Sequence, residues 1–460
     1  MTGLQDVGEW IESVLPGLLA EHEVPAASVA VMVNGEVFTT AHGVLSKTTG
    51  VEATTDSVFQ IGSITKLWTT SLAMQLVDEG ELALDEPVRT YLPEFKLADE
   101  HASATITVRQ LMTHTSGFGG DVFTDTGVGD DCVEKYVATL TDQAQIFPPG
   151  EYYSYNNAGF AVLGRIIEVL RGKGFDQCLK DHLIEPLKLT HAAPGPYEAI
   201  LHRAAVGHVR FEEKQEPKPA AVWALQRSTI PAGAMFATSA SDLMVFAKMH
   251  LDGGLGPDGA RVLSERSVLA MRESQIMLPR IATCDQAWGL GWAIYDLDGG
   301  GRVLGHNGGT IGQTAFFRIE PEHGVAVAVL TNGGNSSSVW REIFARVLGD
   351  LAGLEAPADV VPDPAATMPD PAPFLGTYAN AGEESTVRAD EAGRVFIDYV
   401  PKGISAELGE QPETFEMLPY SDNALISAER TFGSHFTVAF LGDEDGHTPY
   451  MYGSRIAHRK

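Results

Sequence analysis

The chain has 460 residues, of which 44% are hydrophobic and 20% are charged, and its formal net charge is −29 at pH 7. This length exceeds what one compact core usually organises, so we expect a globular protein with more than one domain. The strong negative charge argues against binding to nucleic acid and against docking on an anionic membrane surface.

The first predicted element is an amphipathic helix within residues 1–19, where apolar side chains recur at helical spacing among acidic ones. An export signal would instead combine a basic start with a continuous apolar run. No apolar run in the sequence approaches the length that spans a bilayer. These features lead us to expect a cytoplasmic protein.

The three cysteines, Cys132, Cys178 and Cys284, are isolated from one another and from histidine clusters. Neither a zinc site nor a disulfide framework follows from such spacing. We expect all three to be small buried side chains, and we expect no metal ion.

A β-hairpin should follow the first helix. Residues 27–33 form an apolar run, Asn34-Gly35 is a strong turn signal, and residues 37–40 return as the partner strand. The next helix is expected to begin at Ser63 and to end at Gly80. Beyond it we expect helices over 161–170 and 243–251 and a Gly/Asp-rich loop over 117–131.

Strands return late in the chain. We expect them over 289–295, 314–319 and 325–330, with a final amphipathic helix over 338–351. The order of strands, helical insert, strands and helix favours an α+β fold, with helices on the faces of an antiparallel sheet and a separate all-helical region. A crevice between the two would hold a functional site.

The last part of the chain differs in composition. Residues 353–373 are rich in proline, as in a linker. Residues 374–460 contain short alternating segments, including 386–388, 395–397, 424–426, 435–441 and 450–456. They favour a small β-barrel or sandwich. The expected domains are therefore 1–352 and 374–460, joined by 353–373.

Three motifs carry the chemistry: Ser63-Ile64-Thr65-Lys66, Tyr155-Asn156-Asn157 and His306-Asn307-Gly308. A Ser-x-x-Lys pair alone is weak, because many helices contain one by chance. Together the three motifs supply a nucleophile, a base, a proton relay and polar groups for a carbonyl. They predict a serine enzyme that forms an acyl intermediate.

Ser63 and Lys66 should share one face of a helix. Lys66 can take the serine proton only when burial or nearby positive charge keeps its amine neutral. The start of the helix would direct backbone N–H groups and the positive end of its dipole at a developing oxyanion. The alternative is an ordinary polar helix start beside a solvated lysine.

Tyr155 is the expected proton relay, and Asn157 could hold Lys66 or a substrate amide. The His306 motif should open a strand at the crevice edge, with the Gly309 N–H as a second oxyanion donor. Each has a structural alternative: a core tyrosine, a capping asparagine or a histidine that braces a loop. We expect His114 to be structural, and Trp288 and Trp292 to lie in the core or in a pocket wall.

The motifs resemble those of the serine β-lactamase and penicillin-binding-protein superfamily, in its class C-like branch, over about residues 8–350. The likeness extends to residues 111–117, 148–150, 288–292 and 308–312. It implies that Ser63 is acylated, that Lys66 and Tyr155 share the role of general base, and that no cofactor is needed. One departure is clear: His306-Asn307-Gly308 stands where class C β-lactamases carry Lys-Thr-Gly. This favours esterases, D-aminopeptidases and peptide acyltransferases that use His-x-Gly.

The whole chain resembles the penicillin-binding-protein-type thioesterases of nonribosomal peptide pathways, which carry a C-terminal lipocalin-like domain. That resemblance implies a peptidyl thioester substrate, possibly on a carrier protein, with a D-residue at the acyl terminus and release by macrocyclisation. Arg455 would then steer substrate, or it is a solvated surface arginine. The alternatives are a hydrolase of esters, D-peptides or β-lactams, and a catalytically silent binding protein.

Overall fold

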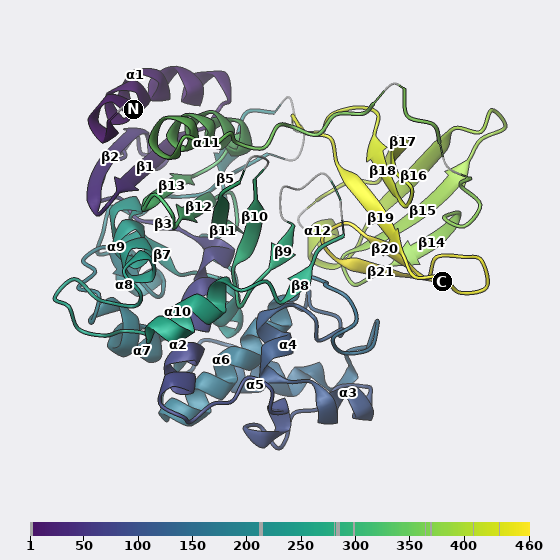
Figure 1. Ribbon diagram of the computed structural model, residues 1–460, viewed down its shortest axis with the longest axis horizontal. Coiled ribbons are helices and arrows are strands. Elements are labelled where there is room, and N and C mark those ends of the chain that lie inside the picture. The colour runs from purple at the N-terminus through teal and green to yellow at the C-terminus, as the bar shows by residue number, and fades with distance from the viewer. Residues whose placement is uncertain are drawn as a thin grey trace.

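The computed structural model describes residues 3–210, 215–279, 281, 286–297, 300–363, 365–368, 370–407, 409–431 and 433–460. Within these ranges an 8-stranded antiparallel sheet forms the larger part of the molecule and a closed barrel forms the smaller part. Figure 1 shows the barrel beside the sheet and its helices. The α+β fold and the small C-terminal β-barrel expected from the sequence are confirmed.

The large sheet has the order β2-β1-β13-β12-β11-β10-β9-β8. Its strands are β1 (Ala26–Val33), β2 (Glu36–Gly43), β8 (Ile276–Met277), β9 (Ala287–Trp288), β10 (Ala293–Asp296), β11 (Arg302–Gly309), β12 (Thr314–Glu320) and β13 (Val325–Thr331). The hairpin expected at Asn34-Gly35 is present. Both turn residues have positive φ, +49° and +87°, and Val33 pairs with Glu36 across the turn. The first and last parts of the sequence therefore meet in one sheet, because β1 pairs with β13.

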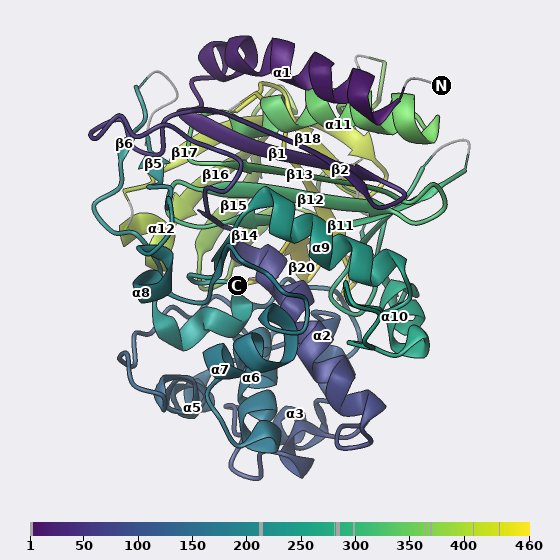
Figure 2. The ribbon, with the colours of Figure 1, turned by 90° about the vertical axis from the view of Figure 1, so that its left-hand side faces the viewer.

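Helices cover both faces of this sheet (Figure 2). On one side lie α1 (Leu4–Glu21) and α11 (Ser336–Ala352), and on the other lie α2 (Thr65–Asp78) and α9 (Ala240–Leu251). Side chains alternate between the two faces along each strand. In β12, for example, Phe316 joins the core beneath α11, while Phe317 joins the core beneath α9.

The helical region follows α2 along the chain. It contains the helices η2 (Val88–Thr90), α3 (Glu100–Thr105), α4 (Val108–Met112), α5 (Cys132–Ala138), η3 (Thr139–Asp142), α6 (Asn157–Arg171), α7 (Phe175–Leu179), η4 (Lys180–Ile184), α8 (Pro196–Ala199), η5 (Arg227–Ala232) and α10 (Glu265–Arg272). Between them run the short strands β3 (Phe59–Gln60), β4 (Ala192–Ala193), β5 (His208–Val209), β6 (Lys218–Pro219) and β7 (Ala237–Thr238). The expected loop over 117–131 is present, without helix or strand.

The barrel closes because its first strand pairs with its last, β14 with β21. Its elements are β14 (Gly376–Ala379), β15 (Glu383–Ala389), β16 (Val395–Pro401), α12 (Gly403–Glu407), β17 (Glu413–Ser421), β18 (Ala424–Ser427), β19 (Thr437–Leu441), β20 (Tyr450–Tyr452) and β21 (Ile456–Arg459). Closure leaves no unpaired sheet edge on the barrel. Between α11 and β14 the described residues form neither helix nor strand, as expected of a proline-rich segment.

Three expectations about strands were wrong in detail. Residues 289–292 are a turn between β9 and β10, closed by a 2.8 Å hydrogen bond from the Gly289 N–H to the Trp292 carbonyl, and Gly291 has a φ of +80°. The segment 450–456 is likewise two strands, β20 and β21, joined by a turn. The His306 motif lies at the end of β11 and does not open a strand.

Cys132 and Cys178 are buried and unpaired, as expected, whereas Cys284 lies outside the described residues. Over the part of the chain that the structure describes, no helix combines the length and apolar character needed to cross a bilayer.

The start of α2 is held against the end of β11 by a glycine. Gly62 lies in the 3₁₀ turn η1 (Gly62–Ile64) with a φ of +51°. A Cβ added there would lie 2.5 Å from the Gly309 nitrogen and 2.8 Å from the Gly309 carbonyl oxygen. Any side chain at this position would push the two segments apart, so Gly62 sets the spacing between Ser63 and β11.

We expect Gly62→Ala to destabilise the fold more than Gly50→Ala. Gly50 also has a positive φ, +67°, but no atom lies within 4 Å of an added Cβ. Gly50→Ala should cost about 1 kcal/mol through backbone strain alone, and Gly62→Ala a further 1–3 kcal/mol, roughly, through overpacking. Urea denaturation of both variants measures the difference. Equal losses of stability would show that η1 and β11 are not closely packed.

Candidate active site

Ser63 lies in the 3₁₀ turn η1 that leads into α2. The sequence predicted that the helix begins at Ser63, whereas the α-helix begins two residues later, at Thr65. The consequence for Lys66 is unchanged, because a continuous helical backbone puts the two side chains on one face. The Lys66 Nζ lies 3.0 Å from the Ser63 Oγ.

The Lys66 amine is completely buried and has three oxygen neighbours. Besides Ser63, it lies 2.8 Å from the Asn157 Oδ1 and 2.7 Å from the Ala232 carbonyl oxygen. Burial lowers the pKa of Lys66 well below its usual value of 10.5, Arg455 lowers it further, and Asp121 partly opposes this. The arrangement therefore favours the neutral amine.

The identity of these neighbours fixes the direction of the amine's lone pair. A carbonyl oxygen and an amide oxygen can only accept hydrogen bonds, whereas a serine hydroxyl can also donate. A neutral amine has two N–H groups, which the Ala232 and Asn157 oxygens would accept. Its lone pair then faces the Ser63 hydroxyl, which is the geometry that a base requires.

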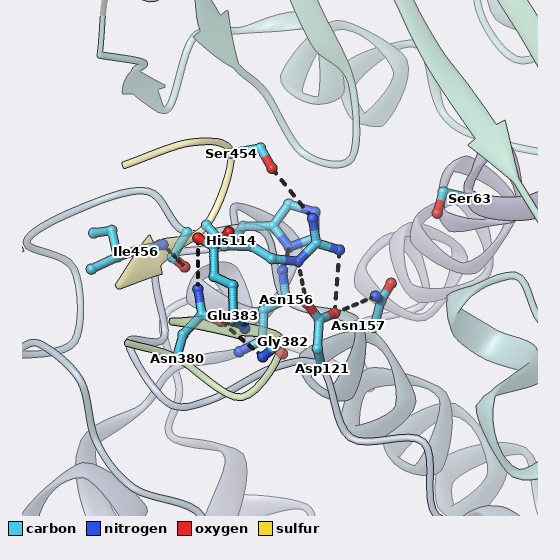
Figure 3. Close-up of polar contacts among 12 residues, drawn as sticks. Ser63, His114, Asp121, Asn156, Asn157, Asn380, Gly382, Glu383, Ser454 and Ile456 are labelled. Carbon is cyan, nitrogen blue, oxygen red and sulfur yellow. Dashed lines mark hydrogen bonds and ion pairs between the residues drawn. The ribbon is translucent and has the colours of Figure 1, made fainter. Parts of the chain in front are cut away.

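Asp121 fixes the orientation of the Asn157 amide. Its Oδ1 accepts a hydrogen bond from the Asn157 Nδ2, at 2.9 Å. Because a carboxylate cannot donate, the amide nitrogen must face Asp121 and the amide oxygen must face Lys66. Figure 3 shows Asp121 beside Asn157, with Ser63 on the adjacent helix start.

Tyr155 lies beside the Lys66 amine. The Lys66 Nζ is 4.8 Å from the centre of the Tyr155 ring, and the His114 ring packs against the Tyr155 ring at an angle of 32°, with centroids 4.3 Å apart. Burial raises the pKa of Tyr155, and the nearby Ser63 lowers it to a smaller extent. Among the described residues the Tyr155 hydroxyl has no hydrogen-bond partner. The phenol thus keeps its proton and lies where it can exchange it with Ser63.

His306 is buried near the same groups. Its Nδ1 lies 2.5 Å from the Asn307 carbonyl oxygen, which can only accept, so Nδ1 carries the proton. Burial, and to a smaller extent Lys66, lowers the pKa of His306 to about 3. His306 is therefore neutral and cannot supply the positive charge of the lysine found in Lys-Thr-Gly motifs.

Gly309 approaches Ser63 through the contact of β11 with η1 described above. A Cβ added at the preceding Gly308 would lie 3.2 Å from the Ser63 nitrogen. The Ser63 and Gly309 backbone nitrogens thus lie at the same edge of the site, an arrangement suited to an oxyanion hole.

The barrel reaches this site through the turn between β20 and β21. The Tyr155 N–H donates to the Ser454 carbonyl at 3.1 Å, and the Ile456 N–H donates to the Ser154 Oγ at 3.0 Å. Arg455 forms an ion pair with Asp121, and its guanidinium lies 5.1 Å from the Tyr155 ring centre. Arg455 is therefore a component of the site and not a freely solvated surface arginine.

A cavity of about 260 Å³ opens beside Ser63, Tyr155 and His306. We call it the acyl cavity. Its remaining wall is mostly apolar and aromatic, and it is formed by both parts of the molecule: Tyr153, Leu278, Ile281, Trp288, Ala293, Tyr295, Asn307, Tyr452, Ser454 and Arg455. Trp288 is thus a wall residue, whereas Trp292 is fully buried in the core.

Two groups at the site escaped the sequence analysis. Asp121 lies in a loop without periodicity, and the Ala232 carbonyl belongs to the backbone. Among the described residues, no group of three His, Cys, Asp or Glu side chains is arranged to hold a metal ion.

The charges around Lys66 predict opposite pH shifts for two variants. The neutral amine is the reactive form, so the acylation rate of Ser63 should rise with pH through a pKa below 10.5. Arg455→Met removes a positive charge and should move this rise to higher pH, whereas Asp121→Asn removes a negative charge and should move it to lower pH.

Acylation by p-nitrophenyl acetate, followed across the pH range of the folded protein, measures both shifts. The control is Arg394→Met, since Arg394 is an exposed barrel arginine paired with Asp390, and its profile should match the wild type. Shifts of Arg455→Met and Asp121→Asn in the same direction would contradict the assignment of the rise to Lys66.

Comparisons with known proteins agree with this geometry. The beta-lactamase family model matches residues 11–349. Penicillin-binding protein 4 of Amycolatopsis lactamdurans is 44% identical over 380 residues, which cover 82% of this chain and 98% of that protein. A class C beta-lactamase mutant has a TM-score of 0.63 at 19% identity, covers 75% of this chain and 97% of its own, and shows the fold alone.

The crystal structure of SurE extends the likeness to the barrel. It has a TM-score of 0.79 and 27% identity and covers 100% of both chains, and the structure of SurE with D-Leu has a TM-score of 0.78 and 28% identity over 99% of both. The chain belongs to the beta-lactamase and penicillin-binding-protein superfamily of serine hydrolases and acyltransferases, as its three motifs predicted.

Proposed function

We propose that this protein is a serine peptidyl transferase that takes a peptide from a thioester, possibly on a carrier protein, and releases it as a macrocycle. The acyl terminus would be a D-residue. The observation that carries the proposal is a buried Lys66 whose Nζ lies 3.0 Å from the Ser63 Oγ, beside a cavity to which the barrel contributes part of the wall. A cytoplasmic location belongs to the same proposal.

In the first half-reaction the Ser63 Oγ attacks the thioester carbonyl while Lys66 accepts the hydroxyl proton. The oxyanion is stabilised by the Ser63 and Gly309 N–H groups. The carbon–sulfur bond breaks, the ester to Ser63 remains, and the proton passes through Tyr155 to the departing thiolate.

In the second half-reaction the peptide's own amine attacks the ester. Its nitrogen forms the new amide bond, its proton moves through Tyr155 or Lys66, and the Ser63 Oγ regains a proton as the ester bond breaks. The aromatic and aliphatic side chains in the wall of the acyl cavity support this outcome, because water must be kept from the ester while the tethered amine is held nearby.

Two further observations support the substrate class. His306 is neutral, so the site lacks the cation of a Lys-Thr-Gly motif that would meet a free carboxylate. The likeness to SurE spans the whole chain, barrel included, and SurE has been crystallised with D-Leu. We therefore propose that the acyl cavity of this protein binds the D-configured residue of the acyl chain.

Loss of the nucleophile or the relay should abolish turnover without unfolding the protein. We expect Ser63→Ala to lose at least on the order of 10³-fold in rate, and Tyr155→Phe about 10²–10⁴-fold. The control Tyr197→Phe changes a ring that is 82% exposed and should retain full activity. Mass spectrometry should find an acyl adduct on Ser63 in the wild type and no adduct in the Ser63→Ala variant. Turnover by Ser63→Ala would refute the acyl-enzyme mechanism.

The ratio of macrocycle to linear acid among the products distinguishes cyclisation from hydrolysis. A linear peptide N-acetylcysteamine thioester with a free amine and a C-terminal D-Leu should give more macrocycle than linear acid, measured by liquid chromatography with mass spectrometry. The same peptide with an acetylated amine should give only acid, slowly, and its L-Leu isomer should react poorly. Linear acid as the main product of the free-amine peptide would favour the hydrolase instead.

A further inference from the structure

A second cavity, of about 150 Å³, lies on the face of the sheet that α11 covers. Its walls come from β10, β12, α11, the segment 357–360 and the barrel residues Arg430, Ser434 and His435. Tyr295 lines both this cavity and the acyl cavity. We call it the Arg318 cavity, after the residue at its floor.

Arg318 is only 6% exposed, yet among the described residues no carboxylate forms an ion pair with it. Its Nη1 donates to the Phe317 carbonyl at 2.9 Å. The guanidinium carbon lies 4.5 Å from the Tyr295 ring centre and 5.3 Å from the Trp340 ring centre. Among the described residues these are the polar and aromatic partners of the guanidinium, and one carbonyl does not use all five of its N–H donors.

The backbone of β11 makes room for this side chain. Gly305 pairs with Arg318 across the sheet, and a Cβ added to Gly305 would lie 2.2 Å from the Arg318 Cδ. Arg318 therefore lies across β11 towards Tyr295 on β10, and its position is set by the absence of a side chain at Gly305.

Positive charge exceeds negative charge among the residues that line the cavity. Arg341 is neutralised by Asp359 at 2.6 Å. Within the described part of the chain, the one hydrogen bond of the Arg430 guanidinium is a 3.5 Å contact with the Gly433 carbonyl. Arg318 and Arg430 thus face one small space, and the Asp359 carboxylate in its wall is paired with Arg341. An anion there would offset the cost of burying Arg318.

We propose that the Arg318 cavity binds a small carboxylate with an aromatic or branched apolar body. The planar guanidinium of Arg318 matches a carboxylate in shape and charge. Arg430 supplies a second donor at the cavity edge. The rings of Tyr295, Trp340 and Phe344 provide apolar walls for the body of the ligand. This binding does not depend on the acylation of Ser63.

Benzoate and its neutral analogue benzamide test the proposal on the full chain. The Ser63→Ala variant excludes acylation, and binding is followed by saturation-transfer NMR and calorimetry. Benzoate should bind and benzamide should not. Adding Arg318→Met should weaken benzoate binding at least about tenfold, Arg430→Met should weaken it less, and Arg394→Met should leave it unchanged.

Three results would overturn the proposal: no benzoate binding, equal binding of benzamide, or unchanged binding in a folded Arg318→Met variant. Circular dichroism checks the fold of each variant. If Arg318→Met does not fold, the comparison of benzoate with benzamide and the Arg430→Met variant decide the question, since Arg430 lies at the surface of the barrel.

Discussion

The catalytic site depends on keeping one amine unprotonated inside the protein. Lys66 has no contact with solvent, and two of its three oxygen neighbours can accept hydrogen bonds but cannot donate them. Loss of water around the amine and the positive charge of Arg455 lower the pKa of Lys66 and so disfavour the proton. The Asn157 and Ala232 oxygens accept the two N–H groups of the neutral amine, and its lone pair then faces Ser63. Burial and orientation thus act together on a single nitrogen atom.

The barrel contributes to that environment from the far end of the chain. Arg455 disfavours the Lys66 charge and also forms an ion pair with Asp121, which in turn orients Asn157. Backbone hydrogen bonds from the same barrel turn hold Ser154 and Tyr155. The two parts of the molecule therefore share one site, and the acyl cavity has walls from both.

Local sequence patterns predicted much of this site. The spacing of Ser63 and Lys66 predicted a common helical face. Asn157 was expected to hold either Lys66 or a substrate amide, and the structure shows the contact with Lys66. Asp121 could not be found, since its role depends on how a loop meets a barrel more than 300 residues away. The end of β11 was misplaced because glycines at a strand terminus resemble those at a strand start.

Titration of the Lys66 side chain by carbon-13 NMR tests whether its amine loses its proton at a pH low enough for Lys66 to act as the base. The Cε resonance can be assigned by its absence in a Lys66→Met variant. We expect this resonance to titrate well below 10.5, the ordinary value for lysine, and to titrate at higher pH when Arg455 is replaced by methionine. A Lys66 side chain that stays protonated up to or beyond 10.5 would contradict its assignment as the base.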